Sequence, residues 1–531
     1  MSHLRRLCSV VAASTLAVTG LTILVTAPAQ AATAPRAVAQ GADWLSGQLT
    51  NGLMQDRQYD FTDYGLSIDT ALALEEVGGH SDQVATVGRA LRDRYYSYTS
   101  GADFGTDDLY AGAIAKALVL AQIADTGPAT YQPHVTNDLE GRVSDSAPTV
   151  GRIEDFVDPT NQFGGDFANV IGQSFAARAL TVADSGLADE TRTFLLDQQC
   201  SAGFFREQFT ADKGSAAQSC DAASGEPSLD TTALVAINLE AISGTPGVSS
   251  ALDHARTWLK AQQNPDGSFG EPANANSTGV AAWALGNTPE SADAAVWLRA
   301  HQADDADRCS GLRGDIGAVA FDDDALANGR SDGVTTAIEG QWRRASAQSL
   351  PALEFLPVAP AARLQVVGPR GYVAAGSTAT YAINGANPGS RLCLSVTGSA
   401  IGGSATSGGT ATLVLKMPAG TADRAVAVVD GDGATAATVS HVLGAKRLTV
   451  KPRHKTVHRR ARLHVVVRGL APGEHVTLRF RGHVVRAGTA TAAGTFVRDI
   501  RVGHKLGKAR IVARGEFPTI RHGRAVVRVV R

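Results

Sequence analysis

Residues 255–285 contain three consecutive pieces: Ala255-Arg256-Thr257-Trp258-Leu259-Lys260-Ala261-Gln262-Gln263, Asn264-Pro265-Asp266-Gly267-Ser268-Phe269-Gly270, and Asn276-Ser277-Thr278-Gly279-Val280-Ala281-Ala282-Trp283-Ala284-Leu285. The first piece is amphipathic, the second is rich in Gly and Asp, and the third is rich in Ala after small hydroxyl residues. Apolar residues three and four positions apart are typical of helices, whereas Pro, Asp and Gly together are typical of loops. The stretch therefore predicts two helices joined by a short loop.

This pattern occurs six times between Gly41 and Leu353, and residues 255–285 are its fifth copy. A period of about forty to fifty residues predicts a repeat architecture, because no single hairpin can bury its apolar face alone. The first helix is repeated at Trp44, Phe194 and Trp297, and the start of the second at Asp69-Thr70-Ala71, Asp230-Thr231-Thr232-Ala233 and Thr335-Thr336-Ala337. Two weaker copies centre on Phe104-Gly105 and Phe163-Gly164.

The Ala-rich second helices can approach one another closely, and the aromatic first helices can cover them. The motif Gln263 with Asp266-Gly267-Ser268-Phe269 resembles the bacterial repeat of the squalene cyclase and protein prenyltransferase superfamily, over roughly residues 40 to 345. That resemblance implies an (α/α)6 toroid over 40–353, with six outer and six inner helices. We expect Trp44, Phe194, Trp258 and Trp297 on outer helices, and Asp69, Asp230 and Thr335 near the starts of inner ones. In such a repeat Gln263 bonds carbonyls of the next unit, Gly267 permits the turn, and Phe269 fills the gap between hairpins.

After Pro351 the periodicity changes to that of short β-strands separated by Gly, Asn, Pro or Asp. Two series of strands follow, over 360–444 and 445–531, and Pro388-Gly389 in the first corresponds to Pro472-Gly473 in the second. Many short strands with regular turns favour immunoglobulin-like sandwiches. The sequence thus predicts a multidomain protein, an all-α toroid followed by two all-β immunoglobulin-like domains.

The N-terminus has the order of a secretory signal peptide: Arg5 and Arg6, an apolar run from Val10 to Val25, and Ala29-Gln30-Ala31. We predict a signal peptide over 1–31 and a secreted or cell-surface location. An uncleaved membrane anchor is less favoured, because the run is shorter than the ~20 residues that a span needs. No later segment is long and apolar enough to predict a transmembrane helix in the mature chain.

Four cysteines lie beyond the predicted signal peptide. Cys200 and Cys220 flank one loop, and we expect them to form a disulfide, as exported proteins often do. Cys309 and Cys393 could bond across domains, but we favour two separate buried thiols.

Charge is divided very unevenly along the chain. Residues 446–531 hold 22 Lys and Arg against three acids, whereas the rest of the chain holds 27 basic and 48 acidic residues. Arg at alternating positions such as Arg479 and Arg481 should coat the sheet faces. Such a module predicts binding to anionic envelope polymers, for example teichoic or other acidic glycans. Solubility or self-association is an equally good interpretation, while few aromatics argue against sequence-specific nucleic-acid recognition.

The resemblance also suggests where chemistry would occur. Class II cyclases protonate an alkene with the central acid of Asp-x-Asp-Asp-Thr-Ala, and Asp230 of Ser228-Leu229-Asp230-Thr231-Thr232-Ala233 stands at that position. Both partner acids are replaced here, by Ser228 and Thr231. Asp before Thr is also an ordinary helix N-cap, and we favour that interpretation. Asp230 remains the single candidate for a catalytic residue.

Binding residues are expected at the mouths of the inner helices. The ligand-binding candidates are Asp69, Asp230, Thr231, Thr278 and Thr335. Asp322, Asp323 and Asp324 form the densest acidic cluster and are candidate metal ligands, although a solvated loop is favoured. No cofactor is expected.

Three functions fit these observations. The favoured one is a secreted, non-catalytic toroid that binds a small molecule, glycan or other polymer in its cavity or at its rim, with the basic module directed to the envelope. An extracellular enzyme of the terpene cyclase or prenyltransferase-like superfamily is the second, and a structural surface protein is the third. Export disfavours the enzyme, because isoprenyl diphosphates are cytoplasmic.

Overall fold

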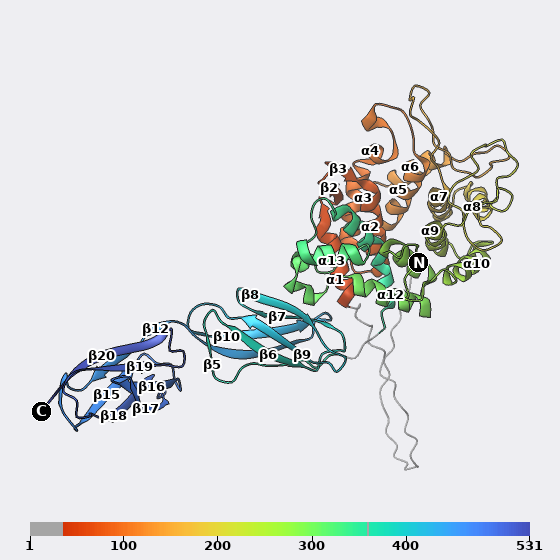
Figure 1. Cartoon of the computed structure of the whole chain (residues 1–531). Coiled ribbons are helices and arrows are strands. Elements are labelled where there is room, and N and C mark those ends of the chain that lie inside the picture. Colours follow the sequence, from red (N-terminus) through yellow and green to blue (C-terminus); the bar gives the residue numbers. More distant parts are fainter. Residues whose placement is uncertain (1–35, 358–360) are drawn as a thin grey trace, which may run out of the picture. The chain divides into compact units, whose positions relative to one another are not determined.

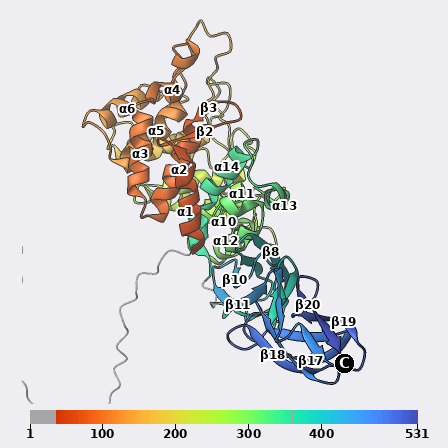
Figure 2. The ribbon, with the colours of Figure 1, turned by 90° about the vertical axis from the view of Figure 1, so that its left-hand side faces the viewer.

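The computed structural model describes residues 36–357 and 361–531, so the predicted signal peptide lies outside the described part. The chain begins there with a ring of paired helices (Figures 1 and 2). The outer helices are α1 (Arg36–Gln48), α3 (Ser81–Arg92), α6 (Tyr131–Glu140), α8 (Ala188–Leu196), α10 (Val248–Lys260) and α12 (Pro289–His301). The inner helices are α2 (Tyr64–Val77), α5 (Ala111–Ala124), α7 (Val170–Val182), α9 (Leu229–Glu240), α11 (Ala275–Leu285) and α14 (Glu339–Ser349).

The inner helices form a closed circle. Each one contacts the next along the chain, and α14 also contacts α2. Trp44, Phe194, Trp258 and Trp297 lie on α1, α8, α10 and α12, so the predicted outer helices are confirmed. Among the described residues, α4 (Tyr95–Thr99) and α13 (Asp323–Asp332) are two further helices that do not belong to this circle.

Glutamine side chains join successive repeats. Each of three glutamines donates two hydrogen bonds from its amide nitrogen, one to its own loop and one to the outer helix of the next repeat. Gln199 donates to the carbonyls of Gly203 and Ala251, and Gln263 donates to those of Gly267 and Glu290. Gln302 donates to the carbonyls of Gly317 and Ala37, and all six distances are 2.8 to 2.9 Å. Because Ala37 belongs to α1, the bond from Gln302 closes the ring between the last repeat and the first.

Gly267 shows why the motif has a glycine four residues after Gln263. Its φ is +90°, and a Cβ there would lie 2.8 Å from the carbonyl oxygen of Asp293 in α12. Any side chain would therefore both strain the turn and push the next outer helix away.

A second contact fixes each loop to its inner helix. In four repeats a loop amide donates to a hydroxyl of the inner helix, at 2.8 to 2.9 Å: Met54 to Ser67, Phe205 to Thr232, Phe269 to Thr278 and Val319 to Ser346. The first three hydroxyls lie one turn inside their helices, and Ser346 lies two turns inside α14. In the third repeat Gln173 Oε1 accepts from Ile153. These hydroxyls define the register of the repeats.

That register corrects two expectations. Ser67-Ile68-Asp69-Thr70 matches Ser228-Leu229-Asp230-Thr231 in residue type, but Ser67 is equivalent to Thr232, so Asp69 lies one turn deeper than the match implied. Asp63 caps α2 by accepting from the amide of Leu66. Thr335 is exposed in the turn before α14, because α13 is inserted into the sixth repeat; Ser346 is the equivalent position there.

The two ends of the ring differ in their loops. Connections from an inner to the next outer helix are short, whereas those from an outer to an inner helix are long and include β1 (Leu49–Thr50), β2 (Leu53–Asp56) and β3 (Phe61–Asp63). All the long connections lead into the N-termini of inner helices and so lie at one end. We call this end the mouth of the toroid.

The C-terminal part consists of strands in several sheets (Figure 1). In the first domain, one sheet has the order β5-β11-β10-β7-β8 and the other β4-β6-β9. The strands are β4 (Gln365–Val367), β5 (Tyr372–Ala374), β6 (Thr378–Asn384), β7 (Arg391–Val396), β8 (Ser399–Ser404), β9 (Ala411–Lys416), β10 (Ala422–Asp430) and β11 (Thr435–Leu443). Alternate residues of both sheets, among them Tyr381 and Leu394, share one core.

The second domain repeats this arrangement, with sheets β12-β20-β19-β16-β17 and β13-β15-β18 and with β14 on β20. Its strands are β12 (Lys446–Arg447), β13 (Thr449–Pro452), β14 (Thr456–His458), β15 (Arg462–Arg468), β16 (His475–Phe480), β17 (His483–Thr489), β18 (Thr495–Arg501), β19 (Gly507–Arg514) and β20 (Arg521–Val530). Phe496 and Ile511 lie in its core. The predicted fold class, a toroid followed by two sandwiches, is confirmed.

The structure contains two disulfides. Cys200 is joined to Cys220, as expected. Cys309 is joined to Cys393, so the favoured interpretation of two separate thiols is wrong. Cys309 ends a 3₁₀ helix of the sixth repeat, and Cys393 lies in β7. The sequence alone does not indicate which residues of two different domains come into contact. Two disulfides are consistent with an oxidising, extracellular environment.

A buried carboxylate lies beside this second disulfide. Asp307 is fully buried and accepts two hydrogen bonds of 2.6 Å from the guanidinium of Arg391, in β7. Burial alone would raise the pKa of Asp307, but these bonds and the charge of Arg391 hold it below its ordinary value. An ion pair and a disulfide therefore connect the same two segments. No helix within the described residues is long and apolar enough to cross a membrane.

Candidate functional site

An ion pair lies at the axis of the ring. Lys116 Nζ of α5 lies 2.6 Å from Asp69 Oδ1 of α2, and it donates to the carbonyl oxygen of Gly65 at 3.1 Å. The same ammonium lies 5.7 Å from the ring centroid of Phe175. Asp69 is thus neutralised by a neighbouring inner helix.

A tyrosine belongs to the same group of side chains. Burial, together with the charges of Asp69 and Asp63, raises the pKa of Tyr98. The phenol therefore stays protonated near these carboxylates.

The axial cavity below this pair is small. It is lined by residues of five inner helices: Asp69, Leu72, Phe175, Arg178, Leu234, Ile237, Asn238, Val280, Trp283, Ala347 and Gln348. Its volume is about 40 Å³, room for roughly three water molecules. Arg178 donates to Asn238 Oδ1 at 3.4 Å, and burial lowers the pKa of this arginine. Side chains of five inner helices thus line this cavity, which is too small for a large substrate.

Asp230 lies at the mouth and does not cap its helix. Ser228 is the N-cap of α9 and accepts from the amide of Thr231 at 3.4 Å, so the favoured capping interpretation of Asp230 is wrong. Solvent reaches the Asp230 side chain, but desolvation by the surrounding protein raises its pKa. The charge of Glu207 raises it further, against a hydrogen bond from Ser277. Asp230 is therefore an acid without a cationic partner among these neighbours.

The other candidate residues do not gather around Asp69. Thr231 is buried and its hydroxyl accepts from Ser228 Oγ at 2.9 Å. Thr278 is fully buried, where it holds the loop at Phe269. Thr335 is exposed before α14. The five ligand-binding candidates thus occupy separate places, with Asp69 lining the axis and Asp230 lying at the mouth.

The acidic cluster of the sixth repeat begins a helix. Asp322 caps α13 by accepting from the amide of Ala325 at 2.8 Å. Asp323 lies 3.1 Å from His301 Nε2 and is otherwise exposed, and Asp324 is exposed too. Within residues 36–357 and 361–531 no three His, Cys, Asp or Glu side chains are placed to hold a metal ion together.

Exposed aromatic side chains form a feature that sequence reasoning missed. Among the described residues, every strongly exposed aromatic lies in a mouth connection of the first three repeats. We call this set the aromatic rim: Tyr59, Phe61, Tyr96, Phe104, Phe156, Phe163 and Phe167. Phe104 is 82% exposed and Phe163 is 94% exposed. In sequence these two phenylalanines were matched to the motif position of Phe269, which is fully buried, and only the structure separates them.

Buried carboxylates hold the central part of the rim in place. Asp108 accepts from the amide of Asp158 at 2.6 Å, and Asp158 accepts from the amide of Asp107 at 3.0 Å. The amide of Asp158 lowers the pKa of Asp108, so this group is ionised at neutral pH. Loops 100–110 and 153–168 are therefore fixed to each other.

Asp155 connects the second of these loops to the ring. It accepts from the amides of Ala111, at the start of α5, and of Phe167, at 2.7 and 2.9 Å. The exposed phenylalanine at 167 is thus presented by ordered backbone.

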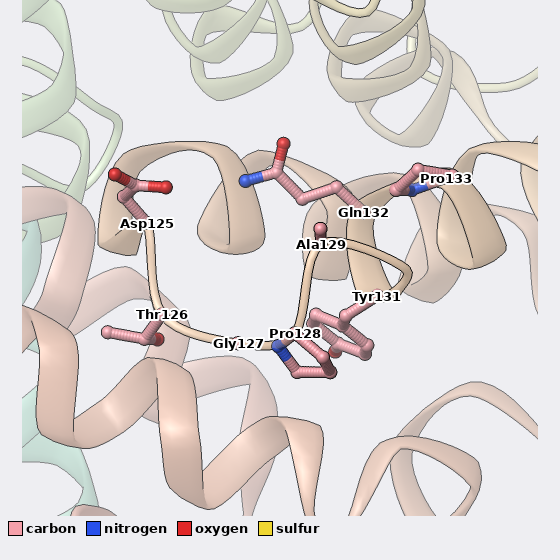
Figure 3. Close-up of a pocket in the computed structure, with 8 residues that line it drawn as sticks. All are labelled: Asp125, Thr126, Gly127, Pro128, Ala129, Tyr131, Gln132 and Pro133. Carbon is pink, nitrogen blue, oxygen red and sulfur yellow. The ribbon is translucent and has the colours of Figure 1, made fainter.

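The opposite end of the ring carries a separate hollow of about 290 Å³, formed by the loop from α5 to α6 (Figure 3). Asp125 is the one charged residue of its lining, and Gln132 donates to the carbonyl of Ala121 at 2.9 Å. Its lining comes from one short segment, which gives it few groups that could converge on a ligand.

Comparisons with known proteins identify no family model and no curated protein that matches this chain. Among solved structures, a protein from Actinoplanes is 18% identical, with 60% of this chain and 98% of that chain covered and a TM-score of 0.41. Type II terpene cyclase MstE from Scytonema is 15% identical, with 60% and 96% covered and a TM-score of 0.42. A variant of α-1,6-mannanase GH76A from Salegentibacter, in complex with α-1,6-mannotriose, is 11% identical, with 61% and 99% covered and a TM-score of 0.40.

Proposed function

We propose that this chain is a secreted or envelope-associated, non-catalytic protein that binds a neutral glycan across the mouth of its toroid. The observation that carries the proposal is the aromatic rim. Loops 100–110 and 153–168, which carry Phe104, Phe156, Phe163 and Phe167, are joined to each other, and clustered exposed apolar groups mark interaction sites on soluble proteins. The rings at Phe104 and Phe163 stand on loops held by buried carboxylates, so a ligand need not order them on binding.

The dimensions of the axial cavity support a surface ligand. About 40 Å³ cannot admit a sugar ring or a polyprenyl chain, so the ligand must lie over the mouth. An extended polymer can contact several rim residues at once, whereas a small molecule cannot.

The charge of the rim supports a neutral ligand. Residues 100–110 and 141–169 contain eight acids and two bases, and a third base, Lys213, pairs with Glu154 and Asp166, so the acids remain in excess. Such a surface repels anionic polymers. Sugar rings combine apolar C–H faces, which stack on aromatic side chains, with hydroxyls that can donate to carboxylates.

The test is binding of the full chain to immobilised neutral polysaccharides, compared between wild type and the double variant Phe104→Ala/Phe163→Ala. If each ring contributes about 1 kcal/mol, the double variant should bind more than tenfold more weakly. Val182→Ala/Val296→Ala is the control, since both valines are exposed away from the rim, at 54% and 52%. Equal binding by the three proteins, or none by wild type, would contradict the proposal and favour the structural surface protein.

A second candidate, an extracellular enzyme, is favoured by one observation. Asp230 has a raised pKa at the mouth and no capping role, as a general acid requires. The test is turnover of neutral glycans and of polyprenyl substrates by wild type and by Asp230→Asn. A rate that falls at least a hundredfold with unchanged glycan affinity would replace the binding protein by the enzyme.

A further inference from the structure

The C-terminal domain has a sheet face that is lined with cations and lacks acids. Strand β19 directs Lys508, Arg510 and Arg514 to the outside, while Ala509, Ile511 and Ala513 between them are buried. On the neighbouring strands, Arg524 pairs with Val512 and Arg528 with Lys508, and Arg479 pairs with Val512 from the other side. These six residues, Arg479, Lys508, Arg510, Arg514, Arg524 and Arg528, therefore share one face, which we call the basic face.

No carboxylate neutralises the basic face. None of its six side chains has an ion-pair partner among the described residues. The three acids of residues 446–531 are all used elsewhere. Glu474 is buried and bound to Arg521 at 2.6 Å, Asp499 lies 2.9 Å from His464, and Glu516 accepts from the amide of His475 at 3.0 Å.

The opposite face of this domain differs. Arg462, Arg468 and Arg501 are exposed on β15 and β18, but the Asp499–His464 pair and the exposed Val497 lie among them. With the exposed Lys451 of β13, which pairs with Val466, this face carries four cations against one acid, whereas the basic face carries six cations and no acid. The basic face therefore has the larger excess of positive charge.

We propose that the basic face binds a linear polyanion of the cell envelope whose charges are phosphodiesters. Lys508 and Arg514 are six residues apart on one strand, so their Cα atoms are roughly 20 Å apart. A single phosphate cannot reach both, whereas a polymer lying along β19 meets successive cations. A shallow hollow of about 300 Å³, lined by Arg479, Arg481, Gly482, Arg510, Val512 and Arg514, gives its phosphates a place between strands.

The side chains of this face favour such a polymer over nucleic acid and over lipid. Its apolar members are short, Val512 and the exposed Val526, and it has no Phe, Tyr or Trp on which a base could stack; its two rings are the imidazoles of His475 and His522, at the Arg514 end. Insertion into a bilayer needs large apolar side chains, which are absent from this face. Guanidinium groups bind phosphate oxygens in pairs, so charge and geometry both suit phosphodiesters.

The experiment uses the full chain and immobilised poly(glycerol phosphate) at several salt concentrations. Wild type should bind, and binding should weaken steeply with salt, because each phosphate contact contributes roughly 0.7 to 0.9 to the slope of log K against log salt. Arg479→Gln/Arg510→Gln/Arg514→Gln should bind at least tenfold more weakly, with a slope smaller by about 2 to 3. A neutral glucan is the probe that should not depend on these residues.

The control is Arg462→Gln/Arg468→Gln/Arg501→Gln, which removes the same charge from the opposite face. It should bind within about threefold of wild type, and both variants should unfold like wild type. Equal losses in the two variants would show that only net charge matters and would overturn the proposal. Binding unchanged at ~1 M NaCl, or stronger binding to duplex DNA or to anionic vesicles than to the polymer, would overturn it too. Loss of rim-dependent glycan binding leaves this result unaffected, because the two tests use different residues and probes.

Discussion

Lys116 Nζ of α5 lies 2.6 Å from Asp69 Oδ1 of α2, so two inner helices are joined by an ion pair at the axis of the ring. The side chains are 15% and 24% exposed, respectively, which places the pair between a surface and a buried salt bridge. Removal of one partner leaves an uncompensated charge, and its cost exceeds the net contribution of the pair.

The first prediction concerns this pair. Lys116→Met should lower the free energy of unfolding by about 1 to 2 kcal/mol, and Asp69→Asn in the same chain should restore most of the loss. Denaturant titrations followed by helical circular dichroism would measure both. Additive effects of the two substitutions would show that the carboxylate and ammonium are not coupled.

The second prediction separates the cap of α9 from the acid at the mouth. Ser228→Ala should cost about 1 kcal/mol, since Ser228 accepts from the Thr231 amide. Asp230→Asn should not destabilise the protein at neutral pH. Because folding raises the pKa of Asp230, the folded state holds its proton more tightly, so this group contributes stability at low pH that is lost as pH rises through the folded pKa.

The measurement is unfolding of wild type, Ser228→Ala and Asp230→Asn between pH 3.5 and 7. The free energy of unfolding of wild type, relative to that of Asp230→Asn, should fall as the pH rises above the ordinary pKa of an aspartate. A larger cost for Asp230→Asn than for Ser228→Ala at pH 7 would restore Asp230 as the cap.

The ring itself could be predicted from sequence because several residue types, each with its own role, repeat with the same period. Gln263, Gly267 and Phe269 each have a separate physical task, and their spacing recurs where the loop is short. The register was less certain, since Ser67-Ile68-Asp69 and Ser228-Leu229-Asp230 agree in type while they differ by one helical turn in place. The N-cap of α2 is Asp63, which lies outside the repeated motif, so the motif could not predict it.

The candidate site could be predicted less well. Asp69 was found, but its partner Lys116 lies in another repeat, 47 positions away, and nothing local links the two. Phe104 and Phe163 looked like core residues because exposure depends on loop geometry that single residues do not determine. The disulfide from Cys309 to Cys393 was missed for a related reason, since it joins different domains.

The third prediction concerns the thiols. Non-reducing peptide mapping of the exported protein should recover Cys200 with Cys220 and Cys309 with Cys393, with no free thiol in the mature chain. Sequence separations of 20 and 84 residues imply contributions of about 3 and about 4.5 kcal/mol from loop closure. Cys309→Ser/Cys393→Ser should therefore lower stability more than Cys200→Ser/Cys220→Ser. Recovery of the peptides of Cys309 and Cys393 as free thiols would contradict the interdomain bond.

The last prediction concerns closure of the ring. Gln302 is fully buried, and its amide donates to the carbonyls of Gly317 and of Ala37, the latter in the first repeat. Gln302→Leu is nearly isosteric but leaves both carbonyls without this donor, and Arg299 loses an acceptor at 2.7 Å. Each unsatisfied buried group costs about 1 to 3 kcal/mol, so the loss should exceed 2 kcal/mol.

Gln262→Leu is the matched control, since Gln262 lies in the turn after α10 and its amide donates only to the carbonyl of Trp258 in that helix, at 3.3 Å. Its cost should stay below about 0.5 kcal/mol. Hydrogen exchange would locate the effect: Gln302→Leu should speed exchange in α1 and α12, which flank the junction of the last and first repeats, more than in α7. Uniform acceleration in all three helices would instead indicate that the ring opens as one unit, with no weak point where its ends meet.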